Sequence, residues 1–192
     1  MNRSSARGSA RSSARSSVRS SVRSSRAVVG GAVMLVMAAP VAWGAAALVT
    51  RGPLADLQPA VSSPFDSARA QVALTRQGDK TTTVLTVHGI GAAALGHTYG
   101  AHLHEGVCRA GDGAAALGHY NHTKEQGLPV VIDAATEIWL DFTVVGAGEG
   151  RAVSHVPFAP TAAARSVVIH AQPTDPITGT AGARLACLPV QW

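Results

Sequence analysis

The segment TTTVLTVHGI, residues 81–90, has the clearest secondary-structure pattern in this 192-residue chain. Val84, Thr86 and His88 alternate along it with Leu85 and Val87. Side chains two residues apart lie on the same face of a β-strand, whereas neighbours lie on opposite faces. The segment therefore predicts a strand with one face in a core and one face toward solvent.

Comparable short runs recur through the rest of the chain, and Gly, Pro, Asn and Asp cluster between them. They are Ala68–Arg76, Thr98–Glu105, Thr136–Val145, Arg151–Val156, Ser166–Ala171 and Arg184–Val190. No amphipathic helix of convincing length follows residue 50. Seven or eight short strands separated by turns are typical of an antiparallel β-sandwich or flattened barrel. We therefore predict one all-β domain over residues 68–192.

The chain before this domain divides into three parts. Residues 1–26 contain seven arginines and no acid in an Arg-Ser-Ser-Ala/Val repeat, which predicts a disordered leader. Residues 27–49 carry no charge and predict one apolar helix, either a cleaved signal sequence or a membrane anchor. Residues 50–67 contain three prolines and predict a linker. Signal and anchor both place the β-domain outside the cytoplasm.

The formal net charge of +5 comes from the leader. From Gly52 onward eight Lys and Arg face eleven Asp and Glu, which leaves a net charge of −3. A nucleic-acid partner is therefore not expected, because such partners require a basic domain. The two cysteines, Cys108 and Cys187, both lie in the exported part, where a single disulfide is the natural state.

Histidines provide the strongest functional signal. His102 and His104 are one residue apart in YGAHLHE, residues 99–105, so a strand would project both imidazoles from one face. His119 follows fifteen residues after His104, and His170 ends the apolar run SVVIH, residues 166–170. Four imidazoles without a nearby thiolate suit copper(II) and also suit zinc, and spacing alone does not choose between the two metals.

In these motifs the chain resembles the copper–zinc superoxide dismutase family, and in particular its copper-only bacterial members. The matching features are HLHE at 102–105 with Cys108 four residues after the second histidine, GHYN at 118–121, SVVIH at 166–170 and GARLAC at 182–187. The resemblance covers residues 68–192. It implies a Greek-key β-barrel of the immunoglobulin-like sandwich type, and the disproportionation of superoxide to oxygen and hydrogen peroxide.

The resemblance also implies roles for individual residues. His102, His104, His119 and His170 match the family's copper ligands, and His119 is in addition its catalytic-centre histidine. Arg184 matches the arginine that attracts and orients the anionic substrate. Cys108 and Cys187 match the intrachain disulfide.

The chain departs from the family where zinc would bind. Residues 123–129, TKEQGLP, contain no histidine, although the family has further zinc ligands after the position of His119. Asp141 lies where the zinc-binding aspartate would fall, but one carboxylate does not hold zinc. We expect copper without zinc. His119 would then be oriented from behind by Asp141 or by the backbone, or Asp141 would remain only as a vestige of the zinc site.

Residues 171–181 are also shorter than the family's charged loop, which predicts a more open copper site. The expected function is a copper-dependent superoxide dismutase outside the cytoplasm, attached to the membrane through residues 27–49 if these are not cleaved. The alternative is a dismutase-like domain that stores or delivers copper without turnover. Arg184 favours the enzyme, because a pure metal carrier does not need to attract superoxide.

Overall fold

The computed structural model describes residues 46–191. The predicted leader at 1–26 and residues 27–45 of the predicted apolar helix lie outside this range. Within residues 46–191, no helix has the length and apolar character needed to cross a membrane.

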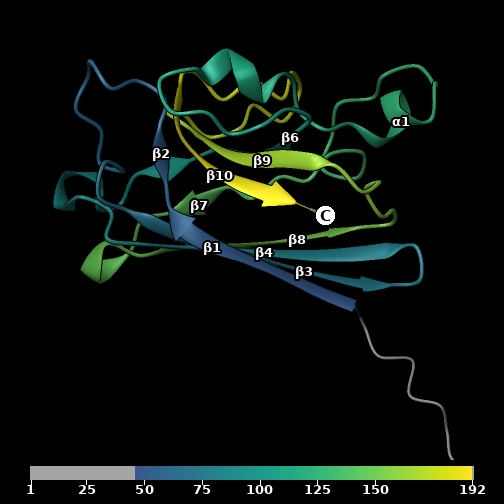
Figure 1. Ribbon diagram of the computed structural model, residues 1–192, viewed down its shortest axis with the longest axis horizontal. Coiled ribbons are helices and arrows are strands. Elements are labelled where there is room, and N and C mark those ends of the chain that lie inside the picture. The colour runs from purple at the N-terminus through teal and green to yellow at the C-terminus, as the bar shows by residue number, and fades with distance from the viewer. Residues whose placement is uncertain (1–45, 192) are drawn as a thin grey trace, which may run out of the picture. The chain divides into compact units, whose positions relative to one another are not determined.

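Two antiparallel sheets of four strands form the fold, and Figure 1 shows them as two layers. The first has the order β1-β3-β4-β8, with β1 at Ala46–Pro53, β3 at Arg69–Gln77, β4 at Lys80–His88 and β8 at Gly150–Val156. The second has the order β2-β10-β9-β6, with β2 at Ala55–Asp56, β10 at Arg184–Gln191, β9 at Ala164–His170 and β6 at Ala101–His104.

Shorter elements connect these sheets. Strands β5 (Thr98–Tyr99) and β7 (Phe142–Thr143) form a two-stranded pair. One turn of α-helix, α1, spans His122–Glu125, and 3-10 turns span Ala92–Ala94, Gly113–Ala116 and Gly146–Gly148.

The hydrophobic core lies between the two sheets. Leu85 and Val87 of β4 face it, as the alternation in residues 81–90 predicts, and Val72 does so from β3. Val167 and Ile169 approach from β9. Burial of each such side chain stabilises the fold by roughly 1.5–3 kcal/mol.

Strand β9 is buried on both faces, because a loop covers the side that faces away from the core. Val168 points to this side and packs with Cys187, Ala116 and Leu57 in a second small cluster. A disulfide joins Cys108 in the loop to Cys187 in β10, as predicted. The loop is therefore tied to the outer side of the second sheet, over the strands that carry three of the predicted metal ligands.

The all-β antiparallel architecture is confirmed, with two corrections. The described strands fall into separate sheets, so the sandwich form of the prediction applies and no barrel is closed. Residues 46–49 of the predicted apolar helix belong to β1, and the predicted linker includes the end of β1 and all of β2. Pairing of β1 with β3 along the whole strand makes this segment part of the sheet. Pro53 is tolerated because it ends an edge strand.

Candidate metal centre

The four predicted ligand histidines lie together in the structure. Each of His102, His104, His119 and His170 offers one ring nitrogen, and the four nitrogens lie within 4.8 Å of one another. His102, His104 and His170 are buried, whereas His119 is partly exposed. The arrangement can hold a metal ion.

Alternation along β6 separates the core from this site. Ala101 and Leu103 face the hydrophobic core, so His102 and His104 project from the other side of the strand. Strand β9 pairs with β6 and ends at His170, which brings that histidine to the same side.

The fourth histidine arrives from a segment that is not part of the main sheets. The backbone N–H of Tyr120 donates to the carbonyl of Leu103 at 2.8 Å, which places His119 beside His104. The N–H of Leu103 donates in turn to the carbonyl of Ile138 at 3.2 Å. Residues 118–121 and 137–140 therefore lie along β6, and hydrogen bonds to this strand hold both segments in place.

Asp141 acts on His102 rather than on His119. The Thr174 hydroxyl donates to Asp141 Oδ1 at 2.6 Å, and its oxygen accepts from His102 Nε2 at 2.7 Å. The backbone N–H of Thr174 holds the other carboxylate oxygen at 2.8 Å. Because the hydroxyl proton is directed at Asp141, His102 must carry its proton on Nε2, and Nδ1 retains its lone pair.

Backbone carbonyls fix two further histidines. His104 Nδ1 lies 3.2 Å from the carbonyl of Leu117, and His170 Nδ1 lies 3.2 Å from the carbonyl of Gly182. A carbonyl only accepts, so each Nδ1 carries the proton and each Nε2 keeps its lone pair. The two Nε2 atoms are 3.2 Å apart, as expected of groups directed at one point.

Glu137 holds His119, a contact that the sequence analysis missed. His119 Nδ1 donates to Glu137 Oε2 at 2.9 Å, and Trp139 Nε1 donates to the same oxygen at 2.8 Å. Asn121 Nδ2 donates to Oε1 at 3.1 Å. The buried carboxylate therefore accepts three hydrogen bonds and leaves Nε2 of His119 as the nitrogen with a free lone pair.

The sequence does indicate where Glu137 lies, because core-facing and outward-facing residues alternate along its segment. Ile138 and Leu140 face the core, so Glu137, Trp139 and Asp141 share the opposite side, which is the side of the metal centre. Thr174 has no comparable signal, because a loop contact brings it to His102 from 72 residues away.

One buried atom gives independent support for a metal. His102 Nδ1 has no hydrogen-bond partner among the described residues, although it is fully buried. Buried polar atoms are almost always satisfied, and an ion is one reason for an exception. Four imidazole nitrogens without a nearby thiolate are a ligand set that suits copper(II) and also suits zinc.

The electrostatics of the site favour metal binding at neutral pH. Burial, together with the neighbouring imidazoles, lowers the pKa of His104 to about 2, and burial lowers the pKa of His170 to about 4. Burial likewise holds the pKa of His102 far below its ordinary value. Burial alone would raise the pKa of Glu137, but its three hydrogen bonds bring that pKa below the usual range. The three buried histidines are thus neutral and Glu137 is ionised, as metal ligation requires.

Arg184 lies beside the histidine cluster. It is the residue opposite His170 in the pairing of β10 with β9. Its guanidinium donates to the carbonyls of Gly113 and Leu117, each at 2.5 Å, and the Leu117 carbonyl is the one that accepts from His104. A fixed positive charge therefore stands at the edge of the site.

Comparison of the chain with models of known protein families finds no match, and comparison with curated proteins finds no significant match. The functional interpretation therefore depends on the motifs and on the geometry of the site.

Proposed function

We propose that the protein is a copper-dependent superoxide dismutase that acts outside the cytoplasm and needs no zinc. The observation that carries the proposal is the convergence of four imidazole lone pairs beside a fixed guanidinium. Zinc has no redox chemistry, so a site for electron transfer at this ligand set requires a metal such as copper. The Cys108–Cys187 disulfide supports export, because disulfides persist in oxidising compartments.

The chain's own residues prepare the site for this chemistry. His102 offers Nδ1, and the other three histidines offer Nε2, because the opposite nitrogen of each ring is hydrogen-bonded. When bound, copper would supply one-electron chemistry, oxidising one superoxide to oxygen and reducing the next, which takes up two protons from water, to hydrogen peroxide. Arg184 keeps its proton at all physiological pH values and attracts the superoxide anion. Steering by a charge of this kind raises association rates by roughly 10 to 10³-fold.

Glu137 supports the proposal that zinc is not required. It occupies Nδ1 of His119, the nitrogen that a second metal would need. A carboxylate behind a ligand histidine fixes the ring orientation and raises its basicity. The protein side chain thereby orients His119 without a second ion.

The test is superoxide decay measured on the purified protein after loading with copper, zinc or both. We expect decay with copper alone, loss of decay in His104→Ala, and association slowed by about tenfold or more in Arg184→Gln. The matched control is Arg109→Gln, because the Arg109 side chain is 68% exposed and pairs only with Asp112 among the described residues.

Two results would change the proposal. Stoichiometric copper binding without superoxide decay would favour a storage or delivery domain. Metal analysis that finds one zinc per chain beside copper would contradict the copper-only assignment.

A further inference from the structure

The outer face of the β1-β3-β4-β8 sheet is exposed to solvent. Along β8, Arg151, Val153 and His155 are exposed and alternate with buried residues. The pairing register places Val153 beside Val84 of β4, and Val84 beside Ala73 of β3. We call this side of the sheet the outer face.

Cations gather at one end of the outer face. Arg51, Gln71, Thr86 and Arg151 are neighbours in one row across the four strands. Arg69 and His88 form the next row. Arg51, Arg69, His88 and Arg151 are here named the basic corner. Neighbouring strands are about 4.8 Å apart, so the corner spans about 14 Å.

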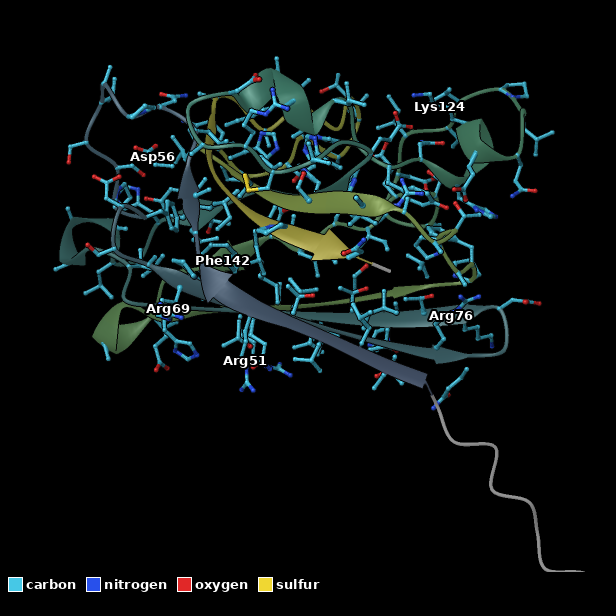
Figure 2. All side chains as sticks on the ribbon, in the orientation of Figure 1. Arg51, Asp56, Arg69, Arg76, Lys124 and Phe142 are labelled. Atoms are coloured by element: carbon cyan, nitrogen blue, oxygen red, sulfur yellow. A yellow bond between two sulfur atoms is a disulfide. The ribbon has the colours of Figure 1, made fainter. Side chains whose placement is uncertain are left out.

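The basic corner encloses a hollow suited to an anion. A cavity of about 270 Å³ is lined by Arg51, Arg69 and His88 together with the hydroxyl of Thr86 and the amide of Gln71. Figure 2 shows Arg51 and Arg69 extending from the sheet on the side away from β9 and β10. None of the corner's three arginines forms an ion pair within residues 46–191, and Glu149 Oε1 lies 3.3 Å from His88 Nδ1.

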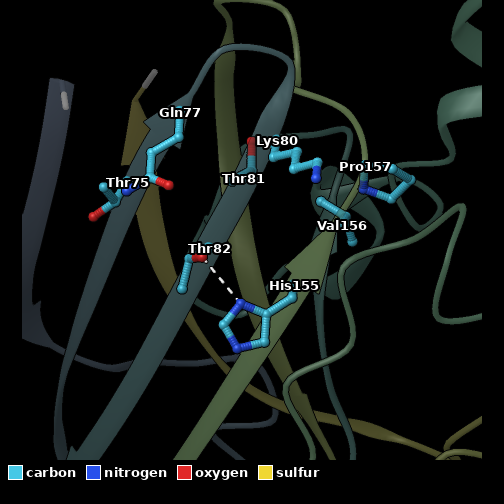
Figure 3. A pocket seen from close by; sticks show the side chains of 8 residues that line it. All are labelled: Thr75, Gln77, Lys80, Thr81, Thr82, His155, Val156 and Pro157. Atoms are coloured by element: carbon cyan, nitrogen blue, oxygen red, sulfur yellow. Dashed lines mark hydrogen bonds between the residues drawn. The ribbon is translucent and has the colours of Figure 1, made fainter. Parts of the chain in front are cut away.

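An apolar row crosses the middle of the face and separates two polar ends. Val49 of β1 is 55% exposed and Val153 of β8 is 40% exposed. Beyond this row, Figure 3 shows a second hollow, of about 340 Å³, where the Thr82 hydroxyl lies 3.0 Å from His155 Nδ1 and Lys80 stands at the rim.

The strands of this first sheet carry positive charge without any negative charge. Its four strands contain five Lys and Arg and no Asp or Glu, although the domain as a whole has an excess of acid. The ligand histidines of β6 and β9 belong to the second sheet and project away from the core. The basic face and the metal centre are therefore on opposite sides of the sandwich.

We propose that the outer face binds the surface of a bilayer that contains anionic phospholipids. Headgroup phosphates occupy the basic corner, while Val49 and Val153 meet the apolar edge of the headgroup region. A flat face of mixed cations and aliphatic side chains fits a membrane interface. Nucleic acid fits it less well, because the four strands of this sheet carry no Phe, Tyr or Trp, the large rings on which bases stack.

This mode of binding has a consequence for access to the metal centre. With the first sheet against lipid, the histidine cluster and Arg184 face the aqueous phase. Residues 27–45, the part of the predicted apolar segment that precedes β1, lead directly into that strand, so a retained anchor would hold this sheet next to the bilayer. The proposal does not depend on which metal is bound or on whether the protein is an enzyme.

Arginine modification of the full chain in vesicles tests the proposal. The protein is incorporated into phosphatidylcholine vesicles, with or without phosphatidylglycerol, and treated with phenylglyoxal, and each modified arginine is quantified by mass spectrometry. Any anchor is present in both samples, so a difference between them does not come from anchoring. We expect Arg51, Arg69 and Arg151 to react about fivefold more slowly with the anionic lipid, because each cation gains about that factor at an anionic surface. Arg109 should react equally in both.

A double variant distinguishes the effect of the basic corner from that of the protein's other positive charges. Arg51→Gln/Arg69→Gln should abolish the protection of Arg151, whereas the matched control Arg76→Gln/Arg109→Gln should retain it. Protection should also disappear at 1 M salt, where the Debye length falls to about 3 Å. Equal modification in both lipids would overturn the proposal. Equal protection by inorganic phosphate or by a DNA duplex, added to the phosphatidylcholine sample, would also overturn it.

Discussion

Glu137→Gln removes the negative charge behind His119 and changes almost nothing in size. The carboxylate accepts from His119 and Trp139 through Oε2 and from Asn121 through Oε1. A glutamine with its oxygen toward His119 directs its NH₂ group at the NH₂ of Asn121, a donor against a donor. The opposite rotamer leaves both ring N–H groups without an acceptor.

The side-chain amide of Asn121 cannot rotate by half a turn to relieve this conflict between donors. Its Oδ1 already accepts from the Thr123 hydroxyl at 2.7 Å and from the Lys124 N–H at 3.1 Å, and its Nδ2 donates to the Val131 carbonyl at 2.6 Å. At least one buried donor is therefore left unsatisfied, which costs about 1–3 kcal/mol, and two charge-assisted bonds become neutral. We expect the metal-free protein to lose about 2–4 kcal/mol of unfolding free energy.

Copper affinity should fall as well, because loss of a carboxylate behind a ligand histidine typically weakens metal binding by about 10–100-fold. Urea unfolding of the metal-free protein measures the first effect, and titration of copper(II) against a competing chelator measures the second. The control is Glu149→Gln, since Glu149 also contacts a histidine Nδ1, that of His88, but both side chains are more than half exposed. Exposed pairs contribute only about 0–1 kcal/mol. If the two variants are indistinguishable in both measurements, Glu137 does not position His119.

Three further predictions follow from the same contacts. Burial lowers the pKa of His170 to about 4 in the folded state, below the unfolded value, so stability is present above pH 6.5 and is lost as the pH falls toward 4. Between pH 6.5 and 4, each such buried histidine should lower the unfolding free energy of the metal-free protein by up to about 1.4 kcal/mol per pH unit. An unfolding free energy, measured by urea denaturation, that stays constant over this pH range would contradict the prediction. Thr174→Val should weaken copper binding in chelator competition by about tenfold, because it leaves His102 Nε2 without an acceptor, whereas Thr174→Ser should bind as the native protein does. The Cys108–Cys187 disulfide joins residues 79 apart in the sequence, so its reduction should lower the unfolding free energy by about 4 kcal/mol. Denaturation with reductant is compared with denaturation without it, and an unchanged midpoint would count against a stabilising disulfide.

Period-two alternation located β4 and β6, but of the predicted run Thr136–Val145 only Phe142–Thr143 forms a strand. The pattern at residues 81–90 matches β4 closely, and the same signal places His102 and His104 on the side of β6 that faces away from the core. It failed at β1, where Ala46–Val49 continue an uncharged run that also fits a helix. Only long-range pairing with β3 distinguishes the two, and a local pattern does not contain that pairing.

The second limit concerns the residues that hold the histidines. The ligands themselves are identifiable because imidazole is rare and its spacing is distinctive. Their partners are common residues in loops, and their positions depend on how those loops cross β6. Asp141 was expected beside His119, yet it contacts His102 through Thr174, and Glu137 takes the place behind His119. Four positions along one flanking segment separate these two carboxylates, and only the register against β6 decides which histidine each one serves.

The distribution of these partners explains how a four-histidine site can be prepared without a second metal. Each ligand ring is fixed at its far nitrogen by a group from a different segment, namely Thr174, Leu117, Glu137 and Gly182. Two of the four are backbone carbonyls, which side-chain substitution does not remove, and a third is a carboxylate held in place by two further donors, Trp139 and Asn121. Because these hydrogen bonds are made by the chain itself, little of a metal's binding free energy is needed to order the four ligand rings. A second metal ion that ordered the same loop would therefore add little, because Glu137 already holds His119.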